Sequence, residues 1–245
     1  MAPVRVNAVI QARLSSTRLP GKVLRPLGGR SVLSWVIRAA QETHNLDTVI
    51  LATSDDPTDD PVADEAARCG AVVVRGPLDD VLARYVKAVR EHPCDAVVRL
   101  TADCPLHDPA VIAQVVAVWR ADPTLDHVSN FVVRRHPRGL DTELVRVAVL
   151  EEQARIATGG HREHVTSNIY TQPDVYRCGG VVPGVDNSDL RVTLDTEEDA
   201  KLLEGVVAEL GDEVPSWQAL VALLRSRPDL VALNADVEQN TTPTT

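Results

Sequence analysis

Two spacings of hydrophobic residues alternate along the first half of the chain. Short runs of β-branched and other apolar residues predict buried strands at residues 4–12, 48–53, 71–74 and 95–101. Apolar residues at helical spacing predict helices at residues 31–43, 59–70, 79–92 and 108–121. Four strand–helix units in succession predict an α/β fold with a mostly parallel, mixed central sheet flanked by helices.

The ends of these predicted helices carry residues that commonly begin or end a helix. Ser31 and Asp108 stand where an N-cap accepts hydrogen bonds from the first backbone N–H groups, and Pro109 occupies a first helical position. Gly70 follows the second helix as its stop.

The second half of the chain is less regular. We expect strands at residues 139–146 and 190–196, and helices at residues 147–157, 197–211 and 216–228. The sequence shows neither an internal repeat nor a Pro/Ser-rich linker. We therefore expect one domain over residues 1–232, followed by a polar, disordered tail at residues 233–245.

Composition narrows the class of protein. The 245 residues are 44% hydrophobic and 24% charged, as in a globular enzyme, and 3% aromatic, so Val, Leu, Ala and Ile must form the core. No apolar run reaches the about 18 residues of a membrane span, and the N-terminus lacks a signal-like stretch. We expect a cytoplasmic protein with no membrane partner. Its four cysteines lack Cys-x-x-Cys spacing, which argues against a zinc site or a redox pair.

Charge is distributed unevenly along the chain. The formal net charge is −10, yet the first 41 residues contain seven basic side chains and no Asp or Glu. The remainder, with 35 acidic against 18 basic side chains, would repel nucleic acid, whose binding requires its phosphates to be neutralised. We therefore expect a small anion on the basic segment and no nucleic-acid partner.

The basic segment includes a loop directly after the first predicted strand. Backbone N–H groups and hydroxyls around Ser16, together with Arg13, Arg18 and Lys22, are the donors that a polyphosphate requires. A solvated basic loop is the alternative, because the segment contains neither Gly-x-x-x-x-Gly-Lys-Ser/Thr nor Gly-x-Gly-x-x-Gly. Ligands of parallel sheets bind beyond the carboxyl ends of the strands, a rule that selects the loops at residues 11–30, 54–57 and 102–107.

The segment IQARLSSTRLPGKVL resembles the N-terminal signature of the cytidylyltransferases that make CMP-activated sugars. The stretches LATSDDPTDDPVADEAARCGAVVVRGPLDDVLARY, VVRLTADCPLHDP, GLDTELV, REHVT and LRVTLDTEEDAKLL follow in the family's order, over roughly residues 6 to 205. The chain resembles the spore-coat polysaccharide type more than the CMP-Kdo and CMP-sialate synthetases. This resemblance implies a single Rossmann-like nucleotidyltransferase domain.

The resemblance also implies roles for the nucleotide-binding and metal-binding residues. Arg13 and Lys22 would hold the triphosphate and stabilise the departing pyrophosphate, while Asp103 and Asp195 would bind Mg²⁺, which prefers oxygen ligands. The alternative for either Asp is a helix cap or a turn, and Asp195 before Thr-Glu-Glu is a good cap candidate. The nucleotide-binding positions of the family, including those near the cytosine, correspond to Gln11, Ala12, Arg13, Ser15, Ser16, Arg18, Lys22 and Thr101.

The residues that would bind the acceptor, the molecule to which the family transfers CMP, are less sharply defined. Asp141 and Glu143 alternate toward one face of a predicted strand, and Arg162 and His164 belong to the block REHVT. These four are the candidate acceptor-binding residues, and solvent exposure is the alternative for each. A sugar hydroxyl would need a general base, with Asp141, Glu143 or His164 as candidates, whereas a phosphonate or other acid is already ionised.

Two positions depart from the family's pattern. Ser15 stands where glycine is common in the first loop, and Ala102 where glycine commonly precedes the metal-binding acid. A left-handed backbone at either position would cost a non-glycine residue roughly 1–2 kcal/mol.

The sequence thus predicts a Mg²⁺-dependent cytidylyltransferase that transfers CMP from CTP to a small anionic acceptor, a sugar acid or a phosphonate, and releases pyrophosphate. By analogy with the family we also expect a homodimer. One alternative is a glycosyltransferase with a sugar-nucleotide donor, although such enzymes generally present Asp-x-Asp where TADCP supplies a single acid. The other is a non-catalytic nucleotide-binding module, which would not need Asp195.

Overall fold

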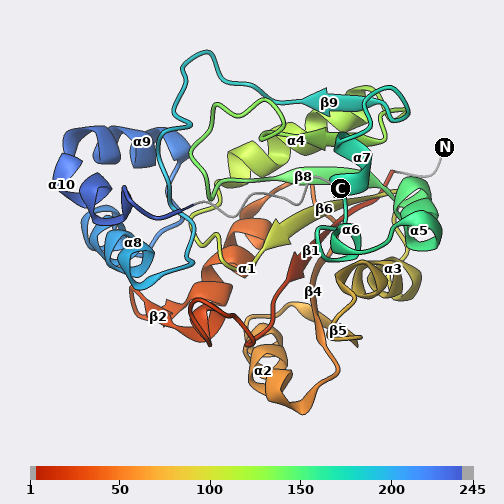
Figure 1. Cartoon of the computed structure of the whole chain (residues 1–245), viewed down its shortest axis with the longest axis horizontal. Helices are drawn as coiled ribbons and strands as arrows, with labels where there is room; N and C mark the ends of the chain where they lie inside the picture. The colour runs from red at the N-terminus through yellow and green to blue at the C-terminus, as the bar shows by residue number, and fades with distance from the viewer. Residues whose placement is uncertain (1–3, 239–245) are drawn as a thin grey trace.

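A seven-stranded mixed sheet forms the centre of the molecule (Figure 1). The computed structural model describes residues 4–238. The strand order is β5-β4-β1-β6-β8-β7-β9. The strands are β1 (Val6–Gln11), β4 (Val49–Ser54), β5 (Val72–Gly76), β6 (Ala96–Thr101), β7 (His127–Ser129), β8 (Glu143–Arg146) and β9 (Cys178–Gly180), with a separate hairpin of β2 (Pro26–Leu27) and β3 (Arg30–Ser31).

The four strands β1, β4, β5 and β6 are parallel to one another. β1 pairs in parallel with β4 and β6, and β4 with β5. β8 is antiparallel to both β6 and β7, while β9 runs parallel to β7. The predicted mostly parallel, mixed sheet is confirmed. In register, Gln11 at the end of β1 lies opposite Thr101 at the end of β6, so the loops that follow these two strands emerge side by side.

Helices cover both faces of the sheet, as the alternating pattern predicts. One face packs on α1 (Val32–Glu42), α2 (Asp60–Arg68) and α4 (Pro109–Ala121), around buried residues such as Ile10 and Leu100. The other packs on α3 (Val81–Glu91) and α5 (Val147–Ile156), around Val9 and Val97. Adjacent strand residues thus point to opposite cores, which explains the continuous apolar runs of the parallel strands.

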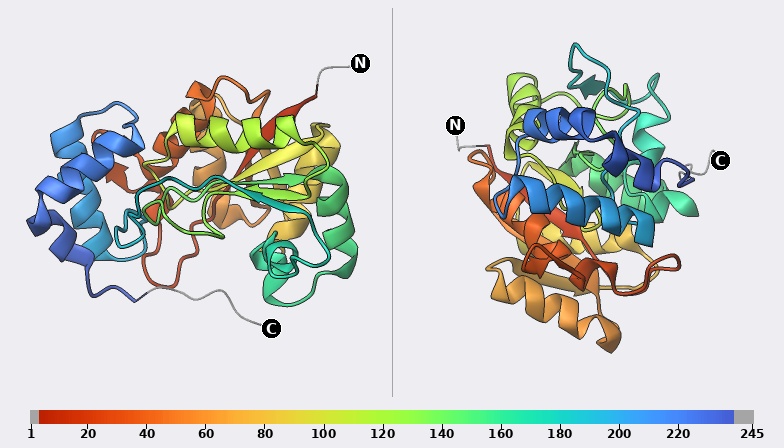
Figure 2. Two further views of the ribbon diagram at one scale, coloured as in Figure 1. Left: turned by 90° about the horizontal axis from the view of Figure 1, so that it is seen from above. Right: turned by 90° about the vertical axis from the view of Figure 1, so that its left-hand side faces the viewer.

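A third layer of helices lies at one side of the molecule (Figure 2). It consists of α8 (Glu197–Leu210), α9 (Trp217–Ser226), α10 (Pro228–Val231) and the 3₁₀ helix η3 (Ala232–Asn234). Its apolar core includes Trp35 and Leu194. Asn234 is buried and donates to Arg191 O and Asp199 Oδ1, so the ordered chain continues past residue 232. The rest of the predicted tail, from residue 239, lies outside the described residues.

Local sequence signals fix the helix boundaries. Ser31 caps α1 by accepting from Ser34 N at 3.1 Å, and Asp108 caps α4 by accepting from Ala110 N at 2.7 Å, as predicted. The remaining short helices are η1 (Lys22–Leu24), η2 (Pro57–Asp59), α6 (Gly160–Glu163) and α7 (Ser167–Tyr170). Within residues 4–238 no helix has the length and hydrophobicity needed to cross a membrane.

Two strand predictions in the second half need correction. Residues 190–196 form no strand of the sheet, only an isolated bridge between Arg191 and Arg138. Their backbone bonds to loops instead: Leu194 N donates to Asp103 O at 2.7 Å, and Val192 N to Arg138 O at 2.7 Å. The strand predicted at residues 139–146 is shorter and begins at Glu143, which leaves Asp141 outside it.

Candidate nucleotide-binding site

A cavity of about 300 Å³ opens beyond the carboxyl ends of β1 and β6. It lies where ligands bind in parallel α/β sheets. Every residue predicted to bind nucleotide or metal lines it. The lining consists of Gln11, Ala12, Arg13, Ser15, Ser16, Thr17, Arg18, Lys22, Val23, Val81, Arg84, Thr101, Ala102, Asp103, Glu163, His164 and Asp195.

The basic loop after β1 has a defined path. Leu14 N donates to Asp59 Oδ1 at 2.7 Å, and Gly21 N closes the loop on Leu14 O at 3.0 Å. Gly21 has φ of 72°, a left-handed conformation that costs glycine little, and the η1 turn that carries Lys22 begins directly after it. Among residues 4–238 the only non-glycine residue with positive φ is Val165, so Ser15 and Ala102 carry no left-handed strain.

Lys22 lies between the two predicted metal-binding carboxylates. Its Nζ is 2.8 Å from Asp103 Oδ2, 2.8 Å from Asp195 Oδ1 and 2.9 Å from Leu194 O. Burial alone lowers the pKa of Lys22, but the charges of Asp103 and Asp195 outweigh burial and raise that pKa above its usual value. Burial raises the pKa of Asp103, and the ammonium of Lys22 outweighs it, so this carboxyl stays ionised.

The Asp195 carboxylate contacts three cations and does not cap α8. Its Oδ2 lies 2.9 Å from a guanidinium nitrogen of Arg18 and 2.9 Å from one of Arg191. The cap of α8 is Thr196, in a capping box with Asp199. Because Thr196 and Asp199 cap the helix, and Asp199 also pairs with Arg191, the Asp195 carboxylate is not needed as a cap and lines the cavity.

The three cations of the first loop all have carboxylate partners from distant parts of the chain. Arg13 contacts Glu163 at 3.2 Å, Arg18 contacts Asp195, and Lys22 contacts both aspartates. The Arg13–Glu163 pair is partly exposed, with side chains 35% and 56% accessible. Pairs of this kind contribute at most about 1 kcal/mol, so an incoming phosphate can displace the carboxylate.

A buried polar network underlies the cavity. Arg99 on β6 pairs with Glu143 on β8, and Glu143 also accepts from His127 Nε2 at 2.8 Å and from Thr166. Burial raises the pKa of Glu143, but Arg99 and these hydrogen bonds outweigh it and lower the pKa to about 2. Glu143 thus stays ionised as the counterion of the Arg99 guanidinium, whose side chain is 13% exposed.

The structure places only one of the four predicted acceptor-binding residues, His164, in the cavity lining. Asp141 forms a two-point ion pair with Arg134, at 2.5 and 2.8 Å. Glu143 is engaged in the buried network and is 1% exposed. Arg162 donates to Asp80 Oδ2 at 2.6 and 2.8 Å. It also donates to two backbone carbonyls, those of Ala154 in α5 and of Ala157 directly after it.

These contacts engage three of the four acceptor candidates, whose acceptor-binding role stays a prediction. Asp141 and Glu143 do not share one face of a strand, because β8 begins only at Glu143 and that side chain turns inward to Arg99. The guanidinium of Arg162 is consumed by the loop before α3, where Asp80 also caps the helix through Ala83 N. Asp141, Glu143 and Arg162 therefore do not line the cavity.

Sequence reasoning assigned no role to two charged residues that line the cavity, Glu163 and Arg84. Glu163 belongs to the block REHVT, and its contact with Arg13 depends on a 150-residue separation that no local pattern reveals. Arg84 is spaced as an exposed helix residue but is 1% exposed. The only local sign that acidic partners would lie near the first loop was the absence of Asp and Glu from the loop itself.

The carboxylates fit a divalent cation. Asp103 and Asp195 present oxygens within 2.8 Å of one common cation, the Lys22 ammonium, and oxygen is the ligand type Mg²⁺ prefers. Within residues 4–238 no cluster of three or more His, Cys, Asp or Glu residues is arranged to hold a metal. Mg²⁺ commonly takes one or two protein carboxylates and completes its shell with water and phosphate oxygens, so two are sufficient.

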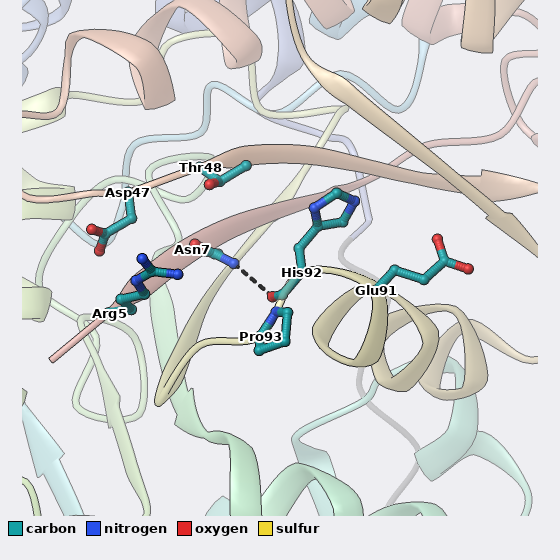
Figure 3. A pocket seen from close by; sticks show the side chains of 7 residues that line it. All are labelled: Arg5, Asn7, Asp47, Thr48, Glu91, His92 and Pro93. Atoms are coloured by element: carbon teal, nitrogen blue, oxygen red, sulfur yellow. Dashed lines mark hydrogen bonds between the residues drawn. The ribbon is translucent and has the colours of Figure 1, made fainter. Parts of the chain in front are cut away.

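A second cavity, of about 330 Å³, lies at the opposite, amino end of the parallel strands (Figure 3). Asn7 on β1 donates there to His92 O at 3.0 Å. Two carboxylates, Asp47 and Glu91, line it against one arginine, Arg5. This balance of charge disfavours a polyphosphate, and the basic cavity at the carboxyl ends is the candidate nucleotide site.

Fold and site together define a nucleotidyltransferase of the Rossmann-like type, and comparison with known proteins gives the family. The family model described as cytidylyltransferase matches residues 7–209. The spore coat polysaccharide biosynthesis protein SpsF of Bacillus subtilis is 32% identical over 231 residues, 90% of this chain and 94% of that protein. This chain belongs to the cytidylyltransferase family.

Two further relatives are similar to this chain. A 3-deoxy-manno-octulosonate cytidylyltransferase of Synechococcus elongatus is 36% identical over 121 residues, 48% of this chain and 48% of that protein. The solved structure of a cytidylyltransferase from Leptospira borgpetersenii is 26% identical, with a TM-score of 0.91, and covers 98% of this chain and 100% of that one.

Proposed function

We propose that this protein transfers CMP from CTP to a small anionic acceptor in a Mg²⁺-dependent reaction. An acceptor oxygen attacks the α-phosphorus of CTP, a new oxygen–phosphorus bond forms, and the bond to the β-phosphate breaks to release pyrophosphate. The observation that carries the proposal is the convergence of Arg13, Arg18, Lys22, Asp103 and Asp195 on one cavity. Family membership favours this activity over a glycosyltransferase or a non-catalytic module.

The cations of the first loop have a clear task in this reaction. Arg13, Arg18 and Lys22 would hold the β- and γ-phosphates, and their charges would stabilise the negative charge that develops on the departing pyrophosphate. The backbone and hydroxyls of Ser15, Ser16 and Thr17 line the same side of the cavity and add neutral donors.

Asp103 and Asp195 would hold Mg²⁺, which when bound supplies charge neutralisation and orientation of the phosphate oxygens. For this to occur, the Lys22 ammonium must leave the two carboxylates, and the triphosphate offers it an alternative anionic partner. The ion pairs of Lys22 would thus be exchanged, with no buried charge left unpaired.

The acceptor class is part of the proposal. The 3-deoxy-manno-octulosonate cytidylyltransferase is named for a sugar acid, and a phosphonate presents similar ionised oxygens. His164 lines the cavity, and burial lowers its pKa, so at neutral pH it is an uncharged group able to accept a proton or a hydrogen bond from the acceptor. The expected homodimer and the cytoplasmic location stay predictions.

The test is thermal unfolding with CTP, UTP, ATP or GTP, each with and without Mg²⁺, followed by pyrophosphate release with candidate acceptors. Stabilisation selective for CTP, by about 2.7 kcal/mol at a hundredfold excess over Kd, is the expected result. Stabilisation by a sugar nucleotide and by no triphosphate would overturn the proposal.

A further inference from the structure

The chain between the short helices α6 and α7 contains a strained residue. Val165 has φ of 54°, and among residues 4–238 it is the only non-glycine residue with positive φ. This conformation is unfavourable for a β-branched residue, because it brings the Cβ atom too close to a backbone carbonyl oxygen. Strain of this kind persists only where the surrounding structure enforces it, and it gathers at functional sites. Val165 directly follows His164, which lines the nucleotide cavity.

The backbone around Val165 forms a γ-turn. Thr166 N donates to His164 O at 2.6 Å, across the single residue that separates them. A γ-turn with positive φ is the rare, strained form of this turn. The turn sends its two flanking side chains to different places, His164 to the cavity lining and Thr166 to the buried network.

Two buried side chains hold the turn in place after His164. The Val165 side chain is 0% exposed and packs in the core that α3 and α5 cover. Thr166 is also 0% exposed and donates its hydroxyl hydrogen to Glu143. Arg99 and His127 engage the same carboxylate. Because Glu143 is fixed by these partners, Thr166 cannot move away without leaving a buried carboxylate with one hydrogen bond fewer.

The segment before the turn is fixed as well. Arg162 is bound to Asp80 and to two backbone carbonyls. His161 Nδ1 lies 2.7 Å from Ser167 Oγ, a contact that joins the two sides of the turn. Since both sides are held, the direction of the His164 side chain is set by the turn between them.

The His164 ring is available to a ligand. Within the described part of the chain no hydrogen bond engages this half-buried side chain, which lines the cavity. Burial and the charge of Arg99 lower the pKa of His164, as does His161, and they outweigh Glu163 and Glu143, which raise it. The ring is therefore uncharged at neutral pH, and one of its nitrogens can accept a hydrogen bond.

We propose that Val165 is a positioning residue: the strained turn around it, held closed by Thr166 on Glu143, keeps the His164 ring at the place in the cavity where CTP meets its acceptor. The identity of the ligand rests on the proposed function, whereas the role of the turn does not. The strain at Val165 is the cost of a chain direction that an ordinary backbone conformation would not give, and the buried contacts on either side of the turn offset it.

The decisive comparison is Thr166→Val against Thr166→Ser. Valine has the shape of threonine without its hydroxyl, so the strained turn should open and the His164 ring should leave its half-buried position. Serine keeps the hydroxyl and should keep the turn. The pKa of His164 is measured without nucleotide by proton–nitrogen correlation NMR of labelled histidines, with His164→Gln to assign the signal. We expect this pKa to rise toward its ordinary value of 6.5 in Thr166→Val and to stay at the wild-type value in Thr166→Ser.

A change at Val165 separates relief of strain from loss of a hydrogen bond. Glycine adopts positive φ without strain, so a double variant, Val165→Gly with Thr166→Val, no longer needs the hydroxyl to hold the turn. Its His164 pKa should return toward the wild-type value. If Thr166→Val does not fold, Val165→Gly and Val165→Ala still test the strain. Val165→Gly should unfold at a higher urea concentration than Val165→Ala, the reverse of the order at an ordinary buried position.

Titration with CTP in MgCl₂ connects the turn to the ligand. The His164 signal should shift on addition of CTP in the wild type and in Thr166→Ser, because the ring lines the nucleotide cavity. The shift should be lost in Thr166→Val and recovered in the double variant. Thermal unfolding of each protein without nucleotide verifies that it is folded.

Three results would overturn the positioning role of Val165: an unchanged His164 pKa in Thr166→Val, a double variant that behaves like Thr166→Val, or a Val165→Ala variant more stable than Val165→Gly. A wild-type His164 signal that does not respond to CTP would overturn the contact with the ligand and count against the proposed function. The pKa comparison, made without nucleotide, would still decide the role of the turn.

Discussion

Lys22 Nζ lies 2.8 Å from Asp103 Oδ2, although 81 residues separate the two in the sequence. The ammonium also contacts Asp195, so one lysine neutralises both carboxylates that the family resemblance assigns to a metal. A divalent cation bound to Asp103 and Asp195, as we propose, would have the same carboxylate partners as this ammonium, and the two positive charges would repel each other.

Replacement of Lys22 by Met should therefore raise the affinity of the nucleotide-free protein for Mn²⁺, by about tenfold, because two carboxylates lose their internal cation. The same change should weaken CTP, since a phosphate-binding charge is lost. A Mn²⁺ titration followed by electron paramagnetic resonance measures the first effect without turnover. Lys87→Met, an exposed change on α3, is the matched control, and equal Mn²⁺ affinity in all three proteins would contradict the prediction.

Glu163 pairs with Arg13, which we propose binds a phosphate of CTP. In the Glu163→Gln variant we expect CTP to bind about two- to threefold more tightly, with the free energy of unfolding changed by less than about 0.5 kcal/mol, because the pair is exposed. Calorimetric titration and urea unfolding measure the two quantities. Glu151→Gln, which removes the exposed partner of Arg90 far from the loop, should change neither; weaker CTP binding by Glu163→Gln would assign Glu163 a different role.

Glu143 makes stability sensitive to acid. Its pKa falls from an ordinary 4.5 to about 2 on folding, so its stabilisation is complete above pH 4.5 and disappears as the pH falls toward 2. At pH 7 the Glu143→Gln variant should be less stable by about 3 kcal/mol, because Arg99 loses its counterion. Urea unfolding between pH 7 and pH 3 should show this difference shrinking with acid; a difference independent of pH would contradict the assignment.

Arg162 stabilises the fold through Asp80. We expect Arg162→Met and Asp80→Asn each to lower stability by about 2 kcal/mol, and the double variant to lose less than the sum, because both changes break one ion pair. Denaturant unfolding of the four proteins gives the coupling energy. Strictly additive losses, together with weakened binding of an acceptor by Arg162→Met alone, would contradict this prediction and support the acceptor role predicted from the sequence.

Gly139 allows the segment before Asp195 to approach closely. A Cβ at this position, where φ is 103°, would lie 2.6 Å from Thr193 N and 2.6 Å from Val192 C. The Gly139→Ala variant should lose about 2 kcal/mol or more of stability and also weaken CTP, because Asp195 moves with its segment. Gly184→Ala, where a Cβ meets nothing within 4 Å, is the control for both measurements.

The sequence alone determined the elements whose signals are local. Continuous apolar runs placed β1, β4, β5 and β6, and apolar residues at helical spacing placed the helices between them. Ser31 and Asp108 marked helix starts that the structure confirms. The basic loop after β1 was evident because no Asp or Glu occurs in the first 41 residues, and the carboxyl-end rule for parallel sheets then located the cavity.

Tertiary structure decided which charges meet. Residues 190–196 look like a strand by alternation, but their backbone bonds to the loops at Asp103 and Arg138, so the segment delivers Asp195 to Lys22 instead of extending the sheet. Glu143 and Arg162 are candidate acceptor-binding residues by sequence, and the structure pairs them with Arg99 and Asp80. Local pattern records the spacing and polarity of side chains, whereas an ion pair depends on contacts between segments that lie far apart in the chain.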